Sequence, residues 1–241
     1  MAPILFFILI LAVVAAVGYL SWRAKQQRRQ GLAAFALQRG WQYSPVDPFG
    51  LVDSDFHLFR MGDGRGAENV MWGKWQDLAV KEADYWYYTE SSDGKGHRTK
   101  TYHRFSVAVA EMGCALPDVS VEREDMGSWV AGHLGFHDIE FESEQFNRMF
   151  KVKAQDREFA FKLLDARMIN WMQSTGGQFG LEVNGPSLLV WSNRRRPTEL
   201  IPLLGCAKMF CDHIPRLVWT QYGTSPAPPD DAAATEERSP S

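Results

Sequence analysis

An uncharged apolar run at the N-terminus is the feature that most constrains this chain. The first charged side chain is Arg23, and the stretch Pro3–Trp22 before it is almost entirely apolar. A helix of about 20 such residues crosses the roughly 30 Å of hydrocarbon in a bilayer. A cleaved signal peptide is the alternative, with small residues for cleavage at Val14–Ala16. Because signal peptides begin with basic residues and carry a shorter apolar run, the sequence predicts an uncleaved transmembrane anchor over residues 1–22.

Basic residues follow this span, and none precede it. They are Arg23, Lys25, Arg28 and Arg29, within a predicted juxtamembrane linker of residues 23–30. The positive-inside rule therefore predicts a single-pass protein of the cell membrane, with its C-terminal side in the cytoplasm. The same four side chains are the predicted contact with anionic lipid, each contributing about 1 kcal/mol near such a surface. Their alternative role is to set the topology alone.

The C-terminal residues 224–241 differ from the rest in composition. They are rich in Pro, Ala and Ser and carry four acidic residues (Asp230, Asp231, Glu236 and Glu237) against the single basic Arg238. This composition predicts a disordered tail. The tail accounts for the whole formal charge of −3, so residues 23–223 are formally neutral. A nucleic-acid-binding domain normally has a basic stripe, so nucleic acid is not a predicted partner.

The stretch Phe136–Met172 is predicted to organise a soluble domain of residues 31–223. Ser143, Asp156 and Asp165 each occupy the position of a helix N-cap, where a side-chain oxygen accepts the free N–H groups of the first turn. Apolar pairs at i,i+4 follow the caps, namely Phe146 and Phe150, Phe159 and Leu163, and Met168 and Met172. Short helices are marginal alone, so we expect these three to pack on a sheet.

The same stretch carries a family resemblance. The pattern E-S-E-x-F-N-x-x-F-x-V-x-x-x-D-x-x-F-A-x-x-L-L spans Glu142 to Leu164. It resembles the central signature of an uncharacterised family of bacterial proteins with an N-terminal membrane anchor. The resemblance implies a hydrophobic N-terminus followed by a mixed strand and helix domain. It implies no activity.

The remaining patterns predict about eight strands and a terminal helix. Alternating or apolar runs, ending at turn residues, predict strands at Trp41–Ser44, Phe56–Leu58, Ala67–Trp75, Leu78–Glu90, His103–Met112, Val119–Arg123, Phe179–Val183 and Leu188–Trp191. Hairpin turns are expected at Met61–Gly66 and Asn184–Gly185, and a helical turn at Met126–Leu134. A short helix at Leu32–Leu37 precedes these strands, and Thr198 is expected to cap a last helix that runs to Ile214. Without a βαβ rhythm, the fold class is α+β with a mainly antiparallel sheet.

Two groups of residues contain the His or Cys side chains that a metal site needs. His133 and His137 are four residues apart, but Gly132 and Gly135 weaken a helix there and no third ligand is evident. Cys206 and Cys211, near His213, are five residues apart, which is the wrong spacing for two ligands on one helical face. With Cys114 they make an odd number without framework spacing, as expected of reduced thiols. The sequence therefore predicts no metal ligand and no cofactor.

Three polar or aromatic clusters have both a structural and a functional interpretation. Tyr85–Tyr88 is either a binding platform or a strand packed on both faces, and the second is favoured. Glu140, Glu142 and Glu144 alternate with other residues, as on a solvated strand edge. Arg194–Arg196 is the only run of three like charges and is expected to be an exposed loop. Its arginines either pair with acids or contact anionic lipid.

No catalytic residue follows from these patterns, and a Gly-x-Ser-x-Gly nucleophile motif is absent. The sequence therefore favours a non-catalytic binding or scaffold domain at the membrane surface, whose partner is a protein or the membrane itself. The alternative is a membrane-tethered enzyme, hydrolytic or metal-dependent, with a site that a single sequence does not reveal.

Overall fold

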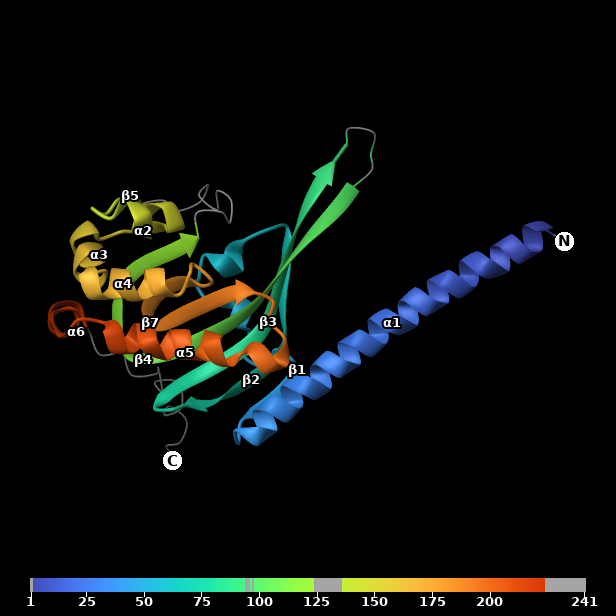
Figure 1. The fold of residues 1–241 in the computed structure, drawn as a ribbon, viewed down its shortest axis with the longest axis horizontal. Coiled ribbons are helices and arrows are strands. Elements are labelled where there is room, and N and C mark those ends of the chain that lie inside the picture. Colours follow the sequence, from blue (N-terminus) through green and yellow to red (C-terminus); the bar gives the residue numbers. More distant parts are fainter. Residues whose placement is uncertain (1, 94–95, 97, 124–135, 224–241) are drawn as a thin grey trace, which may run out of the picture.

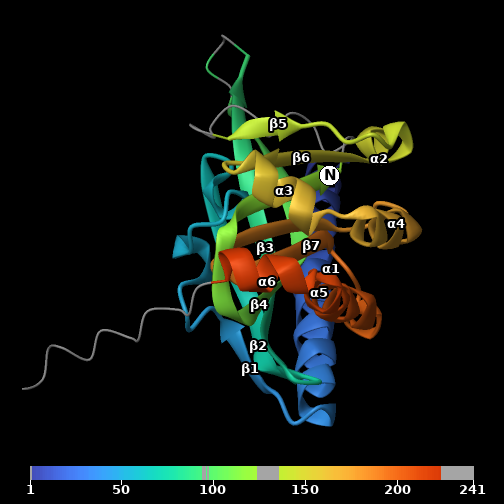
Figure 2. The same cartoon turned by 90° about the vertical axis from the view of Figure 1, so that its left-hand side faces the viewer.

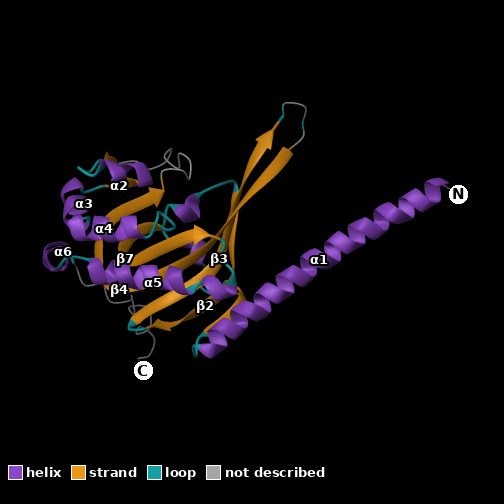
Figure 3. Ribbon diagram, in the orientation of Figure 1, coloured by secondary structure: helices purple, strands orange, loops and turns teal. Residues whose placement is uncertain are grey.

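The computed structural model describes residues 2–93, 96, 98–123 and 136–223. It confirms an α+β fold, with a long N-terminal helix followed by a mainly antiparallel sheet and several helices (Figures 1 and 3). The α-helices are α1 (Ala2–Gln38), α2 (Glu144–Met149), α3 (Arg157–Leu163), α4 (Ala166–Ser174), α5 (Ile201–His213) and α6 (Arg216–Tyr222). The 3-10 helices among these residues are η1 (Leu51–Asp53), η2 (Leu58–Arg60) and η4 (Pro197–Glu199).

The strands are β1 (Gln42–Val46), β2 (Gly64–Trp75), β3 (Leu78–Ser92), β4 (Arg98–Arg123), β5 (His137–Ile139), β6 (Phe150–Ala154) and β7 (Gly180–Asn193). They form one seven-stranded sheet in the order β1-β2-β3-β4-β6-β5, with β7 paired to β4. The long strand β4 is its centre, because β3 and β6 pair with successive parts of one edge and β7 pairs along the other.

Helix α1 is one continuous element of 37 residues, roughly 55 Å long. It is the one described helix that is long and apolar enough to cross a membrane. The separate helix predicted at Leu32–Leu37 is wrong, because α1 continues through residues 23–30 without a break. Leu32, Phe35 and Ala36 at its C-terminal end are buried in the domain core. The same helix therefore contains both the apolar span and a part of the soluble domain.

Two long strands replace pairs of shorter predicted ones. The separate strands expected at His103–Met112 and Val119–Arg123 are wrong, because β4 runs without interruption from Arg98 to Arg123, with register shifts between Glu111 and Val119. The hairpin expected at Asn184–Gly185 is also wrong. Gly185 has a positive φ of 54° but lies inside β7, opposite Leu116 in the irregular part of β4. A local Asn-Gly signal thus marks a bulge, which bends a strand without ending it.

The bend in β7 brings its two ends together. A Cβ atom built on Gly180 would lie 2.3 Å from the ring of Trp191, eleven positions further along the same strand. A side chain larger than hydrogen is therefore excluded at Gly180 while Trp191 keeps its position. Two apolar clusters occupy the two faces of the bent sheet.

Helices cover one face of the sheet, and the segment with η1 and η2 covers the other (Figure 2). The strand expected at Phe56–Leu58 is wrong, because this segment contains η2, and Phe56, Leu58 and Phe59 are buried against the sheet. The hairpin expected at Met61–Gly66 is also wrong, because η2 and not a strand lies directly before it. Residues 61–63 connect η2 to β2, and Gly64 and Gly66 already belong to β2. The glycine-rich segment therefore forms the connection to β2 and the first residues of that strand.

The stretch Phe136–Met172 folds as predicted except at Phe150, which begins β6 and does not share helix α2 with Phe146. Ser143 Oγ accepts the N–H of Phe146, Asp156 Oδ1 that of Phe159, and Asp165 Oδ1 that of Met168, so all three N-caps are confirmed. The four predicted core side chains Phe146, Phe150, Phe159 and Leu163 are buried in one cluster. The helical turn expected at Met126–Leu134 lies outside the described residues.

The C-terminal helix is correct in position but not in its start. Thr198 belongs to η4, and α5 begins at Ile201 with no side-chain cap at Leu200. The helix α6 follows α5 and was not predicted. Pro215 separates the two helices, since proline is tolerated at a helix start but not in its interior.

Candidate functional site

The junction between α1 and the sheet is held by a buried acid. Asp84 on β3 accepts hydrogen bonds from Arg28 Nε at 2.6 Å and from Arg28 Nη2, a bidentate ion pair between residues 56 positions apart. Arg194 Nη2 reaches the same carboxylate at 3.1 Å, and Asn69 Nδ2 donates to it at 2.8 Å. Arg28 also donates from Nη1 to the carbonyl of Arg195 at 2.7 Å. One arginine of α1 thus ties the helix to a strand and to the loop after β7.

The charges at this junction are set by burial and pairing. Burial alone would raise the pKa of Asp84, but the hydrogen bonds and charges of Arg28 and Arg194 outweigh it and hold that pKa below its ordinary value. Glu82 lies two residues away on the same strand face, fully buried, and its carboxylate has no hydrogen-bond partner among the described residues. Burial and the nearby charge of Asp84 raise the pKa of Glu82 well above its ordinary value. Burial therefore favours the neutral form of the Glu82 carboxyl group, whereas pairing with Arg28 and Arg194 favours the charged form of Asp84.

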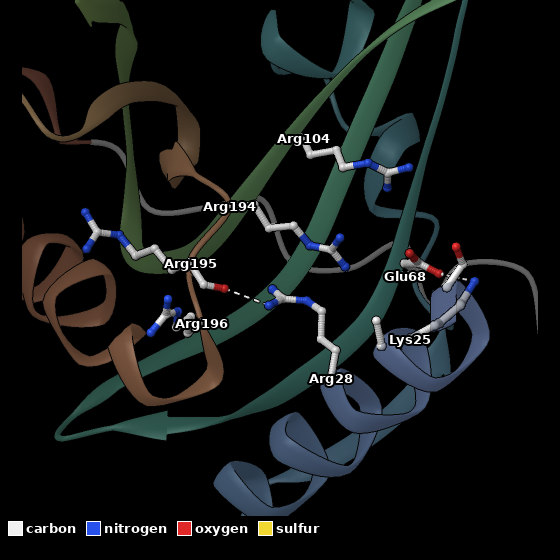
Figure 4. Close-up of a pocket in the computed structure, with 9 residues that line it drawn as sticks. Lys25, Arg28, Glu68, Arg104, Arg194, Arg195 and Arg196 are labelled. Atoms are coloured by element: carbon white, nitrogen blue, oxygen red, sulfur yellow. Dashed lines mark hydrogen bonds and ion pairs between the residues drawn. The ribbon is translucent and has the colours of Figure 1, made fainter. Parts of the chain in front are cut away.

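A basic cleft of about 540 Å³ lies directly beside this ion pair (Figure 4). Its lining combines one helix, two strands and the loop after β7: Ser21, Ala24, Lys25, Arg28, Glu68, Arg104, Arg194, Arg195 and Arg196. We refer to these nine residues as the basic cleft. Six of the nine carry a positive charge, and Glu68 is the single acid among them. The sequence places these basic residues in three separate segments, and the fold brings them together.

The cationic groups in the basic cleft differ in how tightly their neighbours hold them. Lys25 Nζ forms an ion pair with Glu68 at 2.9 Å, although half of the lysine side chain is exposed. Arg195 is held by Ser192 Oγ at 2.8 Å and lies over the ring of Phe179. Arg104 is exposed, with its guanidinium 5.5 Å from the ring of Tyr102. In Figure 4 the side chains of Arg28, Arg104 and Arg194 extend into the space between α1 and the sheet.

The predicted loop of three arginines is therefore only partly solvated. Arg194 and Arg196 are exposed and Arg195 is half-buried, and Arg194 pairs with Asp84. The four basic residues of the predicted juxtamembrane linker also differ in exposure. Arg23 and Lys25 are exposed, whereas Arg28 is committed to Asp84 and Arg29 is half-buried.

The β3–β4 hairpin extends the face that carries Asp84. Trp86 and Tyr88 stack on each other, and Tyr102 of β4 packs against both. Lys100 Nζ lies 4.1 Å from the centre of the Tyr88 ring. Strand residues two positions apart share a face, and Arg104 of the basic cleft lies opposite Trp86 in the ladder. We call Trp86, Tyr88, Lys100 and Tyr102 the hairpin face.

The aromatic cluster predicted at Tyr85–Tyr88 therefore divides between the two sides of β3. Tyr85 and Tyr87 are buried in the apolar cluster below η2, and Tyr85 Oη donates to the carbonyl of Leu58 at 2.8 Å. Trp86 and Tyr88 lie half-buried on the opposite side. The side of β3 with Tyr85 and Tyr87 is therefore packed, as the favoured interpretation required. The side with Trp86 and Tyr88 is only partly covered, by Tyr102 and Lys100.

The other candidates from the sequence do not gather into a site. His133 lies outside the described residues, and His137 is exposed on β5 opposite Ala154. Among the described residues, no three His, Cys, Asp or Glu side chains are placed to hold a metal ion. Burial raises the pKa of Cys206 and of Cys211 to about 12, so neither is a reactive thiolate. Glu140, Glu142 and Glu144 are exposed as predicted.

A second polar group lies below the opposite face of the sheet. Glu182 on β7 is buried and accepts the backbone N–H of His57 at 2.6 Å and of Leu58 at 3.5 Å. Burial raises the pKa of Glu182 to about 8 and that of the neighbouring Glu122 to about 7. The Glu182 carboxyl group accepts the backbone N–H groups at the start of η2, which have no partner within the helix itself. We assign Glu182 a structural role.

The residues that complete the basic cleft were missed by sequence reasoning. Glu68 and Arg104 in the cleft lining, and Asp84 beside it, are charged residues within predicted strands, and no local pattern distinguishes them from solvated strand residues. The usable signal was the charged residue on an otherwise buried strand face, because a buried acid needs a cationic partner. The partner itself, Arg28, was assigned to lipid contact.

Comparison with known proteins identifies a fold and no family. No known protein family matches the sequence, and no curated protein matches it. The family resemblance of Glu142–Leu164 therefore stays a prediction. Among solved structures, the fold is similar to the mycobacterial trehalose monomycolate transport factor A, TtfA, with a TM-score of 0.59 and 14% sequence identity. The similarity covers 79% of this chain and 94% of that chain.

Proposed function

We propose that this protein is a single-pass membrane protein whose soluble domain is a non-catalytic binding domain, held in a fixed orientation on the cytoplasmic membrane surface. The observation that carries this proposal is the continuity of α1. Its apolar part is exposed along its length, and its last turns are buried in the sheet beside the Arg28–Asp84 ion pair. A helix locked in this way transmits the orientation of the span to the domain.

The end of the span is marked by side chains typical of a membrane interface. Tyr19 and Trp22 are exposed and lie against each other, and Arg23 and Lys25 follow within one turn. Aromatic rings and basic groups of this kind gather at the headgroup level, with the basic groups on the cytoplasmic side. This arrangement supports an anchor that stops at Trp22 and a domain in the cytoplasm.

The hairpin face supports contact between the domain and the membrane. Figure 1 shows the β3–β4 hairpin and the N-terminal half of α1 projecting from the same side of the domain. The hairpin face carries two tyrosines, a tryptophan and a lysine, with Tyr102 49% exposed. Such side chains are favourable at the polar boundary of a bilayer. The fold likeness to a transport factor is compatible with an accessory, non-catalytic role of this kind.

Labelling of the full chain in liposomes tests the proposal. Ser92 lies on the same strand side as Tyr88, and Ser91 lies on the opposite side, so the two exposed serines form a matched pair. A spin label on Ser92→Cys, with the half-buried Cys114 and Cys211 replaced by Ser, should be less accessible to a water-soluble relaxation agent than one on Ser91→Cys. Equal accessibility at both positions would contradict docking of the hairpin.

Topology needs a separate measurement. Protease added to intact cells should spare the domain, and the protein should stay in the membrane fraction at full length. Digestion of the domain in intact cells, or a mature N-terminus near Val17, would contradict the cytoplasmic anchor. The alternative of a membrane-tethered enzyme is not favoured by any observation among the described residues.

A further inference from the structure

We propose that the basic cleft binds the phosphate-bearing headgroup of an anionic phospholipid whose acyl chains remain in the bilayer spanned by α1. This inference rests on the proposed function, because it requires the domain to lie at the membrane surface. It assigns one occupant to one cleft and so goes beyond a general attraction of basic residues to lipid.

Charge is the first argument. The basic side chains of the cleft outnumber the acids six to two even when the adjacent Asp84 is counted with Glu68. Asp84 is already satisfied by Arg28, Arg194 and Asn69, so it does not compete for further cations. Glu82 is buried beneath the same junction and does not line the cleft, and burial raises the pKa of its carboxyl group. The cleft therefore keeps an excess of positive charge that an anion would neutralise.

The type of cation is the second argument. Five of the six basic side chains are arginines, whose planar guanidinium groups match the oxygens of a phosphate in pairs. Arg104 contacts an aromatic ring and pairs with no acid among the described residues, and its side chain extends into the space between α1 and the sheet (Figure 4). Lys25 reaches the cleft from the helix side. A phosphate between these two walls could accept hydrogen bonds from both.

Position selects a lipid over a soluble anion. Ser21 and Ala24 line the cleft and flank Trp22, the last residue of the apolar span. The opening is therefore level with the headgroups, where anionic lipid is concentrated. Its volume of about 540 Å³ falls within the range of roughly 300–1,000 Å³ common for small-molecule sites. Tyr102 extends the rim toward the hairpin face, beside Arg104.

Native mass spectrometry of the full chain in nonionic detergent tests this site. The protein is titrated with phosphatidylglycerol, phosphatidylcholine or inorganic phosphate, and the apparent Kd is read from the bound fraction. The cleft variant is Lys25→Gln with Arg104→Gln, which removes one exposed cation from each wall. The matched control is Lys74→Gln with Arg157→Gln, which removes one exposed lysine and one exposed arginine outside the cleft lining.

We expect the wild-type chain to bind phosphatidylglycerol more tightly than phosphatidylcholine. Each lost cation should weaken phosphatidylglycerol binding about fivefold, so the cleft variant should bind about 25-fold more weakly. The control should bind as the wild type does. The thermal midpoints of both variants should match the wild type, because all four side chains are exposed. Arg104→Lys, which keeps the charge and loses the paired donors, should bind with intermediate affinity.

Three results would overturn the proposal. The first is an unchanged phosphatidylglycerol affinity in the cleft variant, and the second is equal binding of phosphatidylcholine by the wild type. The third is inorganic phosphate binding as tightly as the lipid, which would identify a soluble anion as the ligand. The liposome labelling experiment contains no cleft substitution. If the cleft variant binds phosphatidylglycerol as the wild type does while the Ser92 label is protected, the cleft is rejected as the lipid site and docking stands. If the labels at Ser91 and Ser92 are equally accessible, docking itself is rejected.

Discussion

The helical layer of residues 136–172 and the junction between α1 and β3 hold the domain together by different means. In the first, Phe146, Phe159 and Leu163 are completely buried in an apolar cluster. In the second, Arg28 and Asp84 form a charged pair across 56 residues of sequence. Apolar burial gives stability without direction. A buried ion pair contributes little net stability but is costly to break, so it fixes one arrangement of helix and sheet.

The largest effect is expected in the helical layer. Phe159 is fully buried behind the Asp156 cap, so Phe159→Ala should lower the free energy of unfolding by about 3–5 kcal/mol. The matched control is Phe161→Ala on the same helix, where 42% of the side chain is exposed and the loss should be much smaller. Urea unfolding of the full chain in detergent measures both. A loss below about 1 kcal/mol for Phe159→Ala would mean that apolar packing does not dominate this layer.

A smaller loss of stability, confined mainly to the C-terminal part of α1, is expected at the junction. Asp84→Ala leaves Arg28 and Arg194 without their shared acceptor, and should cost about 2–3 kcal/mol because the arginines are not fully buried. Hydrogen exchange should rise selectively in the C-terminal part of α1, near Leu32, before it rises in α3. The pKa of Asp84 is lowered in the fold, so its contribution is present above the ordinary carboxyl pKa and is lost as the pH falls through the folded value.

Exchange that rises equally in both places would remove the contrast between the two regions. Asp84→Asn is the conservative comparison, because it keeps a hydrogen-bond acceptor of the same size and removes the charge. If Asp84→Asn loses less stability than Asp84→Ala, the difference between the two variants measures the missing acceptor.

The sequence predicts the helical layer well because its information is local. Each cap lies three residues before the N–H that it accepts, and the apolar pairs of α3 and α4 are separated by one helical turn. The junction depends on contacts between distant segments. Nothing near Arg28 indicates that it meets Asp84, and its position after the span favours lipid contact. Asn184–Gly185 fails as a hairpin signal for the same reason, because the irregular stretch of β4 that accommodates it is about 70 residues earlier.

Polar burial on the other face of the sheet gives a pH-dependent stability. The pKa of Glu182 is raised by burial to about 8. Its contribution is therefore fully present below the unfolded carboxyl pKa and is lost as the pH rises toward 8. Glu182→Gln keeps the acceptor for His57 and Leu58 and removes the charge. Between about pH 5 and pH 8 the wild type should lose about 2–3 kcal/mol more stability than the variant.

The control for this measurement is Glu144→Gln, which changes an exposed carboxyl group on α2. It should leave the pH profile of the wild type unchanged. A Glu182→Gln profile parallel to that of the wild type would assign the pH dependence to other groups, of which Glu122, with its pKa raised to about 7, is the nearest candidate.

The smallest effect isolates burial from charge. Arg148 and Glu144 on α2 form an ion pair of 3.0 Å, and their side chains are 79% and 83% exposed. Arg28 and Asp84 have the same chemistry, with only 14% and 3% exposed. Water screens the exposed pair and both side chains lose entropy on pairing, so Arg148→Gln should change the free energy of unfolding by less than about 0.5 kcal/mol. Unfolding at low and at high salt should give the same result within error. A loss approaching that of Asp84→Ala would mean that pairing itself, and not the burial of Asp84, determines how strongly α1 is held to the sheet.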